Sequence, residues 1–123
     1  PGPCWRLWEH EVVELFVVGP TDHYTELELS PHGHHLLLRL EGTRNVVAKM
    51  LPLDFRARIS GARWQGVAKL PWSLLPTTPR RGNAFAIHGQ GDRRRHLAAS
   101  PLPGPHPDFH QLDRFPALQL PTP

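Results

Sequence analysis

The run VVELFVV, from Val12 to Val18, constrains the fold of this chain more than any other feature. β-Branched and aromatic residues fill the run and Gly19-Pro20 closes it, which is typical of a β-strand. Side chains alternate across a strand, so Glu14 and Phe16 fall on one face and Leu15 on the other. The run therefore predicts a strand that carries one carboxylate among apolar side chains.

Five further segments have strand patterns. In the first of them, Tyr24, Glu26 and Glu28 share one face, while Leu27 and Leu29 share the other. No segment has the pattern of an amphipathic helix three turns long, and short strands without helices are typical of sandwiches and barrels. We therefore predict an all-β fold, an antiparallel β-sandwich. Its predicted strands are residues 12–18, 24–29, 35–40, 46–51, 65–70 and 84–88.

The length of 123 residues predicts a single domain. Its 15 prolines gather near both ends and between Pro71 and Pro79, where they mark loops and tails. Residues 1–105 are expected to form the sandwich core. Residues 106–123 are expected to form a Pro-rich segment that packs on its surface. The expected anchors of that segment are Phe109, Leu112 and Phe115.

The net charge is +3 with histidine neutral, and much of the basic character lies in two short arginine runs, at residues 80–81 and 93–95. A nucleic-acid module has a longer basic stripe interleaved with exposed aromatic residues, so we expect no nucleic-acid partner. No run of about 18 apolar residues occurs, and we expect no membrane partner. The single cysteine, Cys4, excludes an intrachain disulfide and favours a reducing, cytoplasmic compartment.

Several motifs occur in a characteristic order: LWEHEVVELFVV, then YTELELSPHGHHLLL, then WQGVAKLPWSLLP, followed by FAIHG and PDFH. In this order they resemble an uncharacterised family typified by the human protein called chromosome four open reading frame thirty-three. That family is in turn similar to family-nine carbohydrate-binding modules and DOMON-like β-sandwiches. The resemblance implies additional strands ahead of LWEHEVVE, so we expect the sandwich to be truncated at its N-terminal side.

Glu14 must be paired, hydrogen-bonded or placed at a cleft, because burying a bare carboxylate is costly. Two interpretations stay open: a structural ion pair with Arg39, or contact with a ligand. Together with Glu26, Arg39 and His88, it could line a groove suited to hydroxyl-rich ligands, since these groups offer fixed acceptors and donors. Glu26 and Glu28 by themselves favour a solvated strand face.

The resemblance adds roles for particular residues. Family-nine modules grip a sugar between two tryptophans, and Trp8 looks like the first of them. Glu14 then looks like a hydroxyl-binding acid, and Glu26 falls where the next strand supplies another polar contact. The second tryptophan, often within a "WSP" string, is replaced by Ala98-Ala99-Ser100-Pro101, which removes one stacking face.

The nine histidines prompt a search for a metal site. His32, His34 and His35 lie at a predicted turn where side chains diverge, whereas zinc needs three or four converging ligands. We expect no metal and no cofactor. No serine has a nucleophile-elbow context, and we expect no enzyme. The predicted function is a binding module for a carbohydrate or small hydroxylated ligand; the alternative is a protein-interaction or scaffold module without a glycan ligand.

Overall fold

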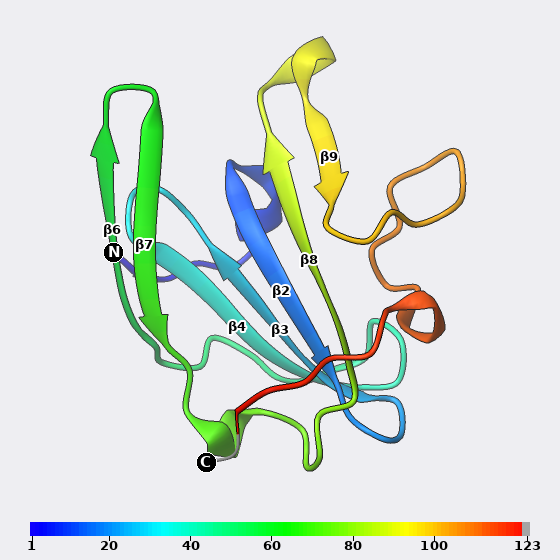
Figure 1. Ribbon diagram of the computed structural model, residues 1–123. Helices are drawn as coiled ribbons and strands as arrows, with labels where there is room; N and C mark the ends of the chain where they lie inside the picture. Colours follow the sequence, from blue (N-terminus) through cyan, green and yellow to red (C-terminus); the bar gives the residue numbers. More distant parts are fainter. Residues whose placement is uncertain (122–123) are drawn as a thin grey trace.

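The computed structural model describes residues 1–121, and within them almost all regular structure is β-strand (Figure 1). The larger sheet has the strand order β1-β4-β3-β2-β8-β9, with β5 paired to β4. Its strands are β1 (Gly2–Pro3), β2 (Val12–Val18), β3 (His23–Leu29), β4 (His34–Glu41), β5 (Val46–Ala48), β8 (Arg81–His88) and β9 (Arg95–Ala98). A second sheet pairs β6 (Asp54–Ser60) with β7 (Arg63–Lys69).

Short 3-10 turns connect some of these strands. They are η1 (Leu7–Glu9), η2 (Trp72–Leu74), η3 (Gly91–Arg93) and η4 (Leu112–Arg114). Among the described residues, no helix has the length and hydrophobicity that crossing a membrane requires.

The predicted all-β class is confirmed, and all six predicted strands exist. The fourth of them, β5, is shorter than predicted, since it ends at Ala48 and Met50 has a positive φ of 57°. Three strands were missed: the two-residue β1, the largely exposed β6, whose sequence is DFRARIS, and the basic β9. The expectation of purely antiparallel pairing was wrong at one edge, because β1 pairs with β4 in parallel.

The main hydrophobic core lies on one face of the larger sheet. On this face of β2, Val12, Phe16 and Val18 are almost fully buried, whereas Val13 on the other face is 37% exposed. Phe16 packs against the rings of Tyr24 and Phe85. Burying a side chain of this size contributes about 1.5–3 kcal/mol, so this face supplies much of the stability of the fold.

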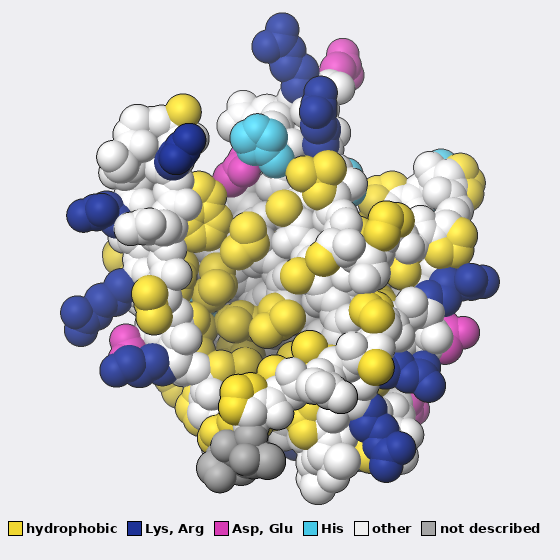
Figure 2. Space-filling view, in the orientation of Figure 1, with side chains coloured by type: hydrophobic (Ala, Val, Ile, Leu, Met, Phe, Trp, Pro, Cys, Tyr) yellow, Lys and Arg dark blue, Asp and Glu magenta, His cyan; other side chains and the backbone are white. Residues whose placement is uncertain are grey.

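The opposite face of the larger sheet is only partly covered. The β6–β7 hairpin stands in front of β4 in Figure 1, and Val17, Leu27 and Leu37 on this face are buried. Further along the sheet, Figure 2 shows an apolar hollow between the hairpin and the β8–β9 side. Side chains such as Val13 and Leu97 line this part of the face. We call it the open apolar face.

The C-terminal segment is part of the core rather than a surface layer. Phe115 is 5% exposed, and Phe109 and Leu112 pack against the same cluster, which confirms the three predicted anchors. Beyond them the chain runs along β8, where the N–H of Gly82 donates to the carbonyl of Pro116. The approach is close enough that a Cβ at Gly82 would lie 2.8 Å from Leu118 Cδ2. The boundary predicted at residue 105 stays a prediction. The last two residues of the predicted C-terminal segment, 122–123, lie outside the described residues.

Candidate functional site

Three glutamates meet on the core face of the larger sheet. In the β2–β3 register Glu14 lies directly opposite Glu28, and Glu26 lies two residues before Glu28 on β3. Glu14 and Glu26 are 5% and 4% exposed, and Glu28 is fully buried. One carboxylate oxygen from each lies within 4.8 Å of the others. We call Glu14, Glu26 and Glu28 the acid cluster.

The expectation that Glu26 and Glu28 lie on a solvated face was wrong. Their strand, β3, lies between β2 and β4, both of which are apolar on their two faces. Residues from both ends of the chain, including Leu7 and Phe115, pack on this face of the sheet, and the alternation of β3 alone cannot indicate that cover. Opposite Glu28 on β4 stands Leu36, which is also fully buried.

Burial changes the acidity of the cluster. It raises the pKa of Glu14 to about 8, with the negative charge of Glu26 adding to the effect and Arg94 opposing it. Burial, together with the neighbouring Glu26 and Glu14, also raises the pKa of Glu28, to about 12. Removing a carboxylate from water and placing it beside like charges both disfavour the ionised form.

The acid cluster lines one side of a cavity of about 890 Å³. Both ends of the chain contribute to it, with Trp5 and Trp8 near the N-terminus and Phe109 and His110 in the C-terminal segment. Arg94 and His96, from the β8–β9 connection and β9, also line it. The site thus combines carboxyl groups with aromatic rings and nitrogen donors.

The two tryptophans are held in place by their neighbours. Their rings meet edge to face with centroids 5.3 Å apart. Lys49 Nζ lies 4.9 Å from the centroid of the Trp5 ring. Arg94 Nη2 donates to the Trp8 carbonyl at 2.5 Å, and Nη1 donates to the Glu9 carbonyl at 3.2 Å. These bonds tie η1 to the β8–β9 connection and so fix one cavity wall.

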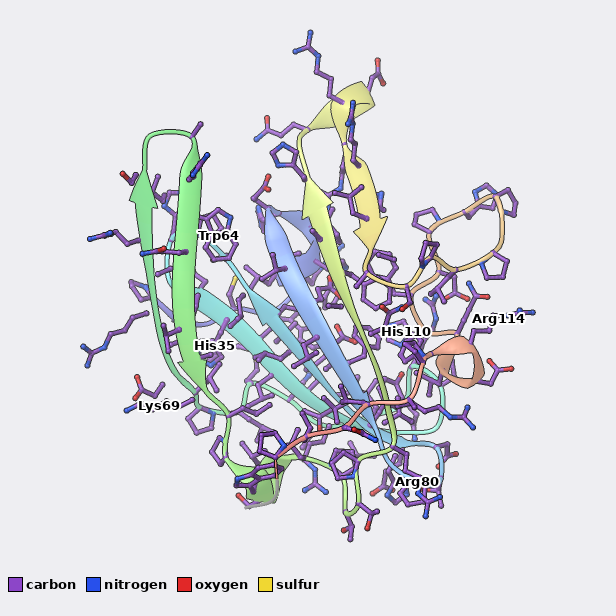
Figure 3. The ribbon with its side chains drawn as sticks, viewed as in Figure 1. His35, Trp64, Lys69, Arg80, His110 and Arg114 are labelled. Carbon is purple, nitrogen blue, oxygen red and sulfur yellow. The ribbon has the colours of Figure 1, made fainter. Side chains whose placement is uncertain are left out.

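His110 joins the C-terminal segment to the acid cluster. Figure 3 shows it lying inward beside the sheet, whereas Arg114 points outward. The Tyr24 hydroxyl accepts the N–H of Arg44 at 2.9 Å and lies 2.7 Å from His110 Nδ1. When the hydroxyl proton is donated to Nδ1, a neutral ring carries its proton on Nε2, which lies 3.6 Å from Glu26 Oε1. Burial lowers the pKa of His110 and favours this neutral form.

Replacing Tyr24 with phenylalanine is expected to lower the free energy of unfolding by about 1–2 kcal/mol, because two polar partners lose their bond inside the protein. Urea denaturation measures the change. The matched control, Arg44→Ala, removes an exposed ion pair with Asp108 but keeps the backbone N–H, and should cost under about 1 kcal/mol. A Tyr24→Phe variant as stable as the wild type would contradict the role given to this hydroxyl.

Of the five predicted site residues, the structure brings together Trp8, Glu14 and Glu26. Placing Arg39 and His88 in the same groove was wrong. Arg39 stands opposite Thr25 on the other face of the sheet and is exposed, so it cannot pair with Glu14.

His88 also lies on the side of β8 opposite to Phe85 and Ile87, and its Nδ1 is 2.6 Å from Glu11 Oε2. Strand parity decides both cases: residues 35, 37 and 39 of β4 share the face that the acid cluster does not occupy.

The string at residues 98–101 has a structural role. The Asn83 side chain donates to the Ser100 carbonyl and accepts its N–H. His35, one of the three clustered histidines, is buried with Nε2 3.0 Å from the Leu51 carbonyl. Sequence reasoning missed Trp5, Arg94, His96, Phe109 and His110 as cavity residues, because only the sheet order and the course of the C-terminal segment bring them to the acid cluster.

Three curated relatives align with nearly all of this chain. The UPF0462 protein C4orf33 homolog of Mus musculus is 48% identical over 94% of the chain and 64% of its own length. The UPF0462 protein C4orf33 of Homo sapiens is 45% identical over 99% of the chain and 65% of its own length. The homolog of Danio rerio is 42% identical, with 94% and 62% covered. The chain is similar to these UPF0462 proteins over nearly all of its length.

These UPF0462 relatives support the family resemblance that the motifs indicated. The chain spans less than two thirds of the length of each of them. No protein-family model matches the chain, and no solved structure matches it. The further likeness to family-nine carbohydrate-binding modules and DOMON-like sandwiches stays a prediction.

Proposed function

We propose that this protein is a non-catalytic binding module whose cavity takes a small hydroxyl-rich ligand of the carbohydrate type. The observation that carries the proposal is the meeting of Glu14, Glu26 and Glu28 with Trp5 and Trp8 around one cavity. Its volume of about 890 Å³ lies within the range of small-molecule sites, roughly 300–1,000 Å³.

The chemistry of the walls suits a sugar. A tryptophan ring offers a flat apolar surface to the C–H face of a pyranose. Stacking removes both surfaces from water, which favours binding. Carboxyl oxygens accept hydrogen bonds from hydroxyl groups, while the Arg94 guanidinium offers donors. Glu28 has two buried oxygens for which the described residues supply no hydrogen-bond partner. Such groups gain most from a ligand that brings donors.

A non-catalytic role agrees with the position of the carboxyl groups. Glycoside hydrolysis uses two carboxyl groups that flank the scissile bond, about 5–9.5 Å apart depending on mechanism. The acid cluster instead projects from neighbouring positions of β2 and β3, and one carboxylate oxygen from each residue lies within 4.8 Å of the other two. All three groups would approach a ligand from the same side.

The proposal includes a fold and a compartment. We take the two sheets as parts of one β-sandwich of the carbohydrate-binding-module or DOMON-like kind, because β6–β7 stands over the second face of the larger sheet. The one cysteine, Cys4, is free, which favours a reducing compartment such as the cytoplasm.

Binding is tested by titrating mono- and oligosaccharides, selected on a glycan array, against tryptophan fluorescence and calorimetric heat. We expect Trp8→Ala to weaken binding at least about tenfold, which corresponds to roughly 1.4 kcal/mol. Trp72→Ala is the matched control, because Trp72 is 43% exposed on η2 and lies outside the cavity. A wild-type protein that binds no glycan, or a Trp8→Ala variant that binds as well as the wild type, would contradict the proposal.

The second candidate function is a protein-interaction module, and the open apolar face favours it. Val13 and Leu97 are 37% and 52% exposed there, and contiguous exposed apolar surface often marks an interaction site. A Leu97→Asp variant that loses a co-purifying protein, while Trp8→Ala retains it, would support this candidate. Glycan binding that Leu97→Asp leaves unchanged would support the cavity instead.

A further inference from the structure

The acid cluster gathers three carboxyl groups on one wall of the cavity. The other ionisable side chains that line this cavity are Glu9, Arg44, Arg94, His96 and His110. The Arg94 guanidinium donates hydrogen bonds to the carbonyls of Trp8 and Glu9. His110 Nε2 stands 3.6 Å from Glu26 Oε1. Within residues 1–121, no lysine or arginine forms a salt bridge with any of the three acids.

A second observation points independently to a ligand. Glu28 is fully buried, and neither of its carboxylate oxygens has a hydrogen-bond partner among the described residues. Glu28 is also one of the residues that line the cavity. A buried polar atom without a hydrogen-bond partner is costly and therefore rare. Because both carboxylate oxygens of Glu28 are of this kind, we expect a bound ion or ligand to supply their partner.

The spacing of the acids fits one particular partner. Oxygen ligands bind Ca²⁺ at about 2.3–2.6 Å, so two ligands on opposite sides of the ion lie roughly 5 Å apart. The three candidate oxygens lie within 4.8 Å of one another, which lets one such ion contact all of them. Mg²⁺ needs about 2.0–2.1 Å and near-ideal octahedral geometry, whereas the flexible coordination of Ca²⁺ suits carboxylates that project from two neighbouring strands.

We propose that Glu14, Glu26 and Glu28 bind one Ca²⁺ ion, and that the bound ion coordinates hydroxyl groups of the cavity ligand. Ca²⁺ takes six to eight oxygen ligands, more than three monodentate carboxylates provide. The cavity beside the cluster leaves room for water or ligand hydroxyls at the remaining positions. The second half of this inference rests on the proposed hydroxyl-rich ligand, whereas the first half stands without it.

The ion site is tested with the full chain, first stripped with EDTA. Tb³⁺ replaces Ca²⁺, and its luminescence is excited through Trp5 and Trp8; calorimetry with Ca²⁺ and with Mg²⁺ gives the affinities. We expect Ca²⁺ to bind more tightly than Mg²⁺ and to raise the melting temperature. Glu28→Gln should weaken Ca²⁺ binding at least about tenfold, because it replaces a charged ligand with a neutral amide.

The matched control is Glu41→Gln, which changes an exposed acid at the end of β4 outside this cavity. It should bind Ca²⁺ as the wild type does. Circular dichroism of each variant shows whether it is folded. Wild-type protein that binds no Ca²⁺ up to several millimolar, the weak end of known sites, would overturn the proposal. So would equal affinities in folded Glu28→Gln and Glu41→Gln.

Repeating the glycan titration with Ca²⁺ and with EDTA separates the two halves. Glycan binding that disappears in EDTA supports both. Glycan binding that is equal in EDTA overturns the role of the ion in ligand recognition but leaves the proposed function standing. Ca²⁺ binding that depends on Glu28, in a protein that binds no glycan, supports the ion site and overturns the proposed function.

Discussion

Replacing Phe115 with alanine is expected to lower the free energy of unfolding by about 3–5 kcal/mol. The ring is 5% exposed and meets those of Phe16 and Phe85, with centroids 5.9 and 6.0 Å away. Its removal leaves a void between β2, β8 and the C-terminal segment, and the hydrogen-bonded strands cannot readily move to fill it. Chemical denaturation followed by fluorescence and circular dichroism measures the loss.

Leu120→Ala is the control within the same segment, since Leu120 is 37% exposed. Its effect should stay below about 1 kcal/mol. If the two variants were equally stable, the C-terminal segment would not belong to the core. If Phe115→Ala fails to fold, Phe115→Leu, with an expected loss of about 1–2 kcal/mol, keeps the comparison measurable.

Replacing Glu28 with glutamine is expected to stabilise the protein at pH 8 by about 1–3 kcal/mol, measured in EDTA. The folded pKa of Glu28 lies far above its ordinary value of 4.5, so the folded state holds the proton more tightly than the unfolded chain does. The stability linked to this group is therefore complete below about pH 4.5 and declines as the pH rises toward the folded pKa. Each unit of pKa difference is worth about 1.4 kcal/mol.

Glutamine has nearly the shape of the protonated acid and does not ionise, so Glu28→Gln removes this part of the pH dependence. Melting temperatures should differ by roughly 4–12 °C at pH 8 and converge toward pH 4.5. Glu14, whose pKa is raised to about 8, keeps its own contribution, and Arg94, His110 and Cys4 also face the cluster. The exposed control Glu41→Gln should follow the wild type at every pH. A Glu28→Gln variant that is less stable at pH 8 would show that the buried carboxylate is favourable.

The sequence predicted the strands that alternate or that are apolar throughout. β2 was predicted with its exact bounds, because β-branched and aromatic residues fill it and turn residues close it. β6 was missed although its apolar and charged residues alternate, because the arginines in and after it give the segment the character of a polar loop. The parallel pairing of the two-residue β1 leaves no trace in local sequence, since parallel pairing joins segments distant along the chain.

The candidate site was predicted in part for a similar reason. Glu14 could be recognised because a carboxylate in an apolar strand needs a partner. Its actual neighbours, Glu26 and Glu28, were predicted to be solvated from the alternation of their own strand. That alternation cannot reveal which other segments cover each face of the strand. Arg39 was misplaced because strand register, not charge complementarity, decides which face a residue occupies.

The cavity walls come from opposite ends of the chain. Arg94 reaches back 86 residues to Trp8, and His110 reaches back 86 residues to Tyr24. Contacts between segments so distant in sequence carry a large loop-closure entropy and form late relative to local hairpins. During synthesis, β2, β3 and β4 emerge with their three glutamates long before Arg94 and His110 exist to cover them. A newly made chain therefore passes through a stage in which the sheet can pair while the acid cluster is still open to water.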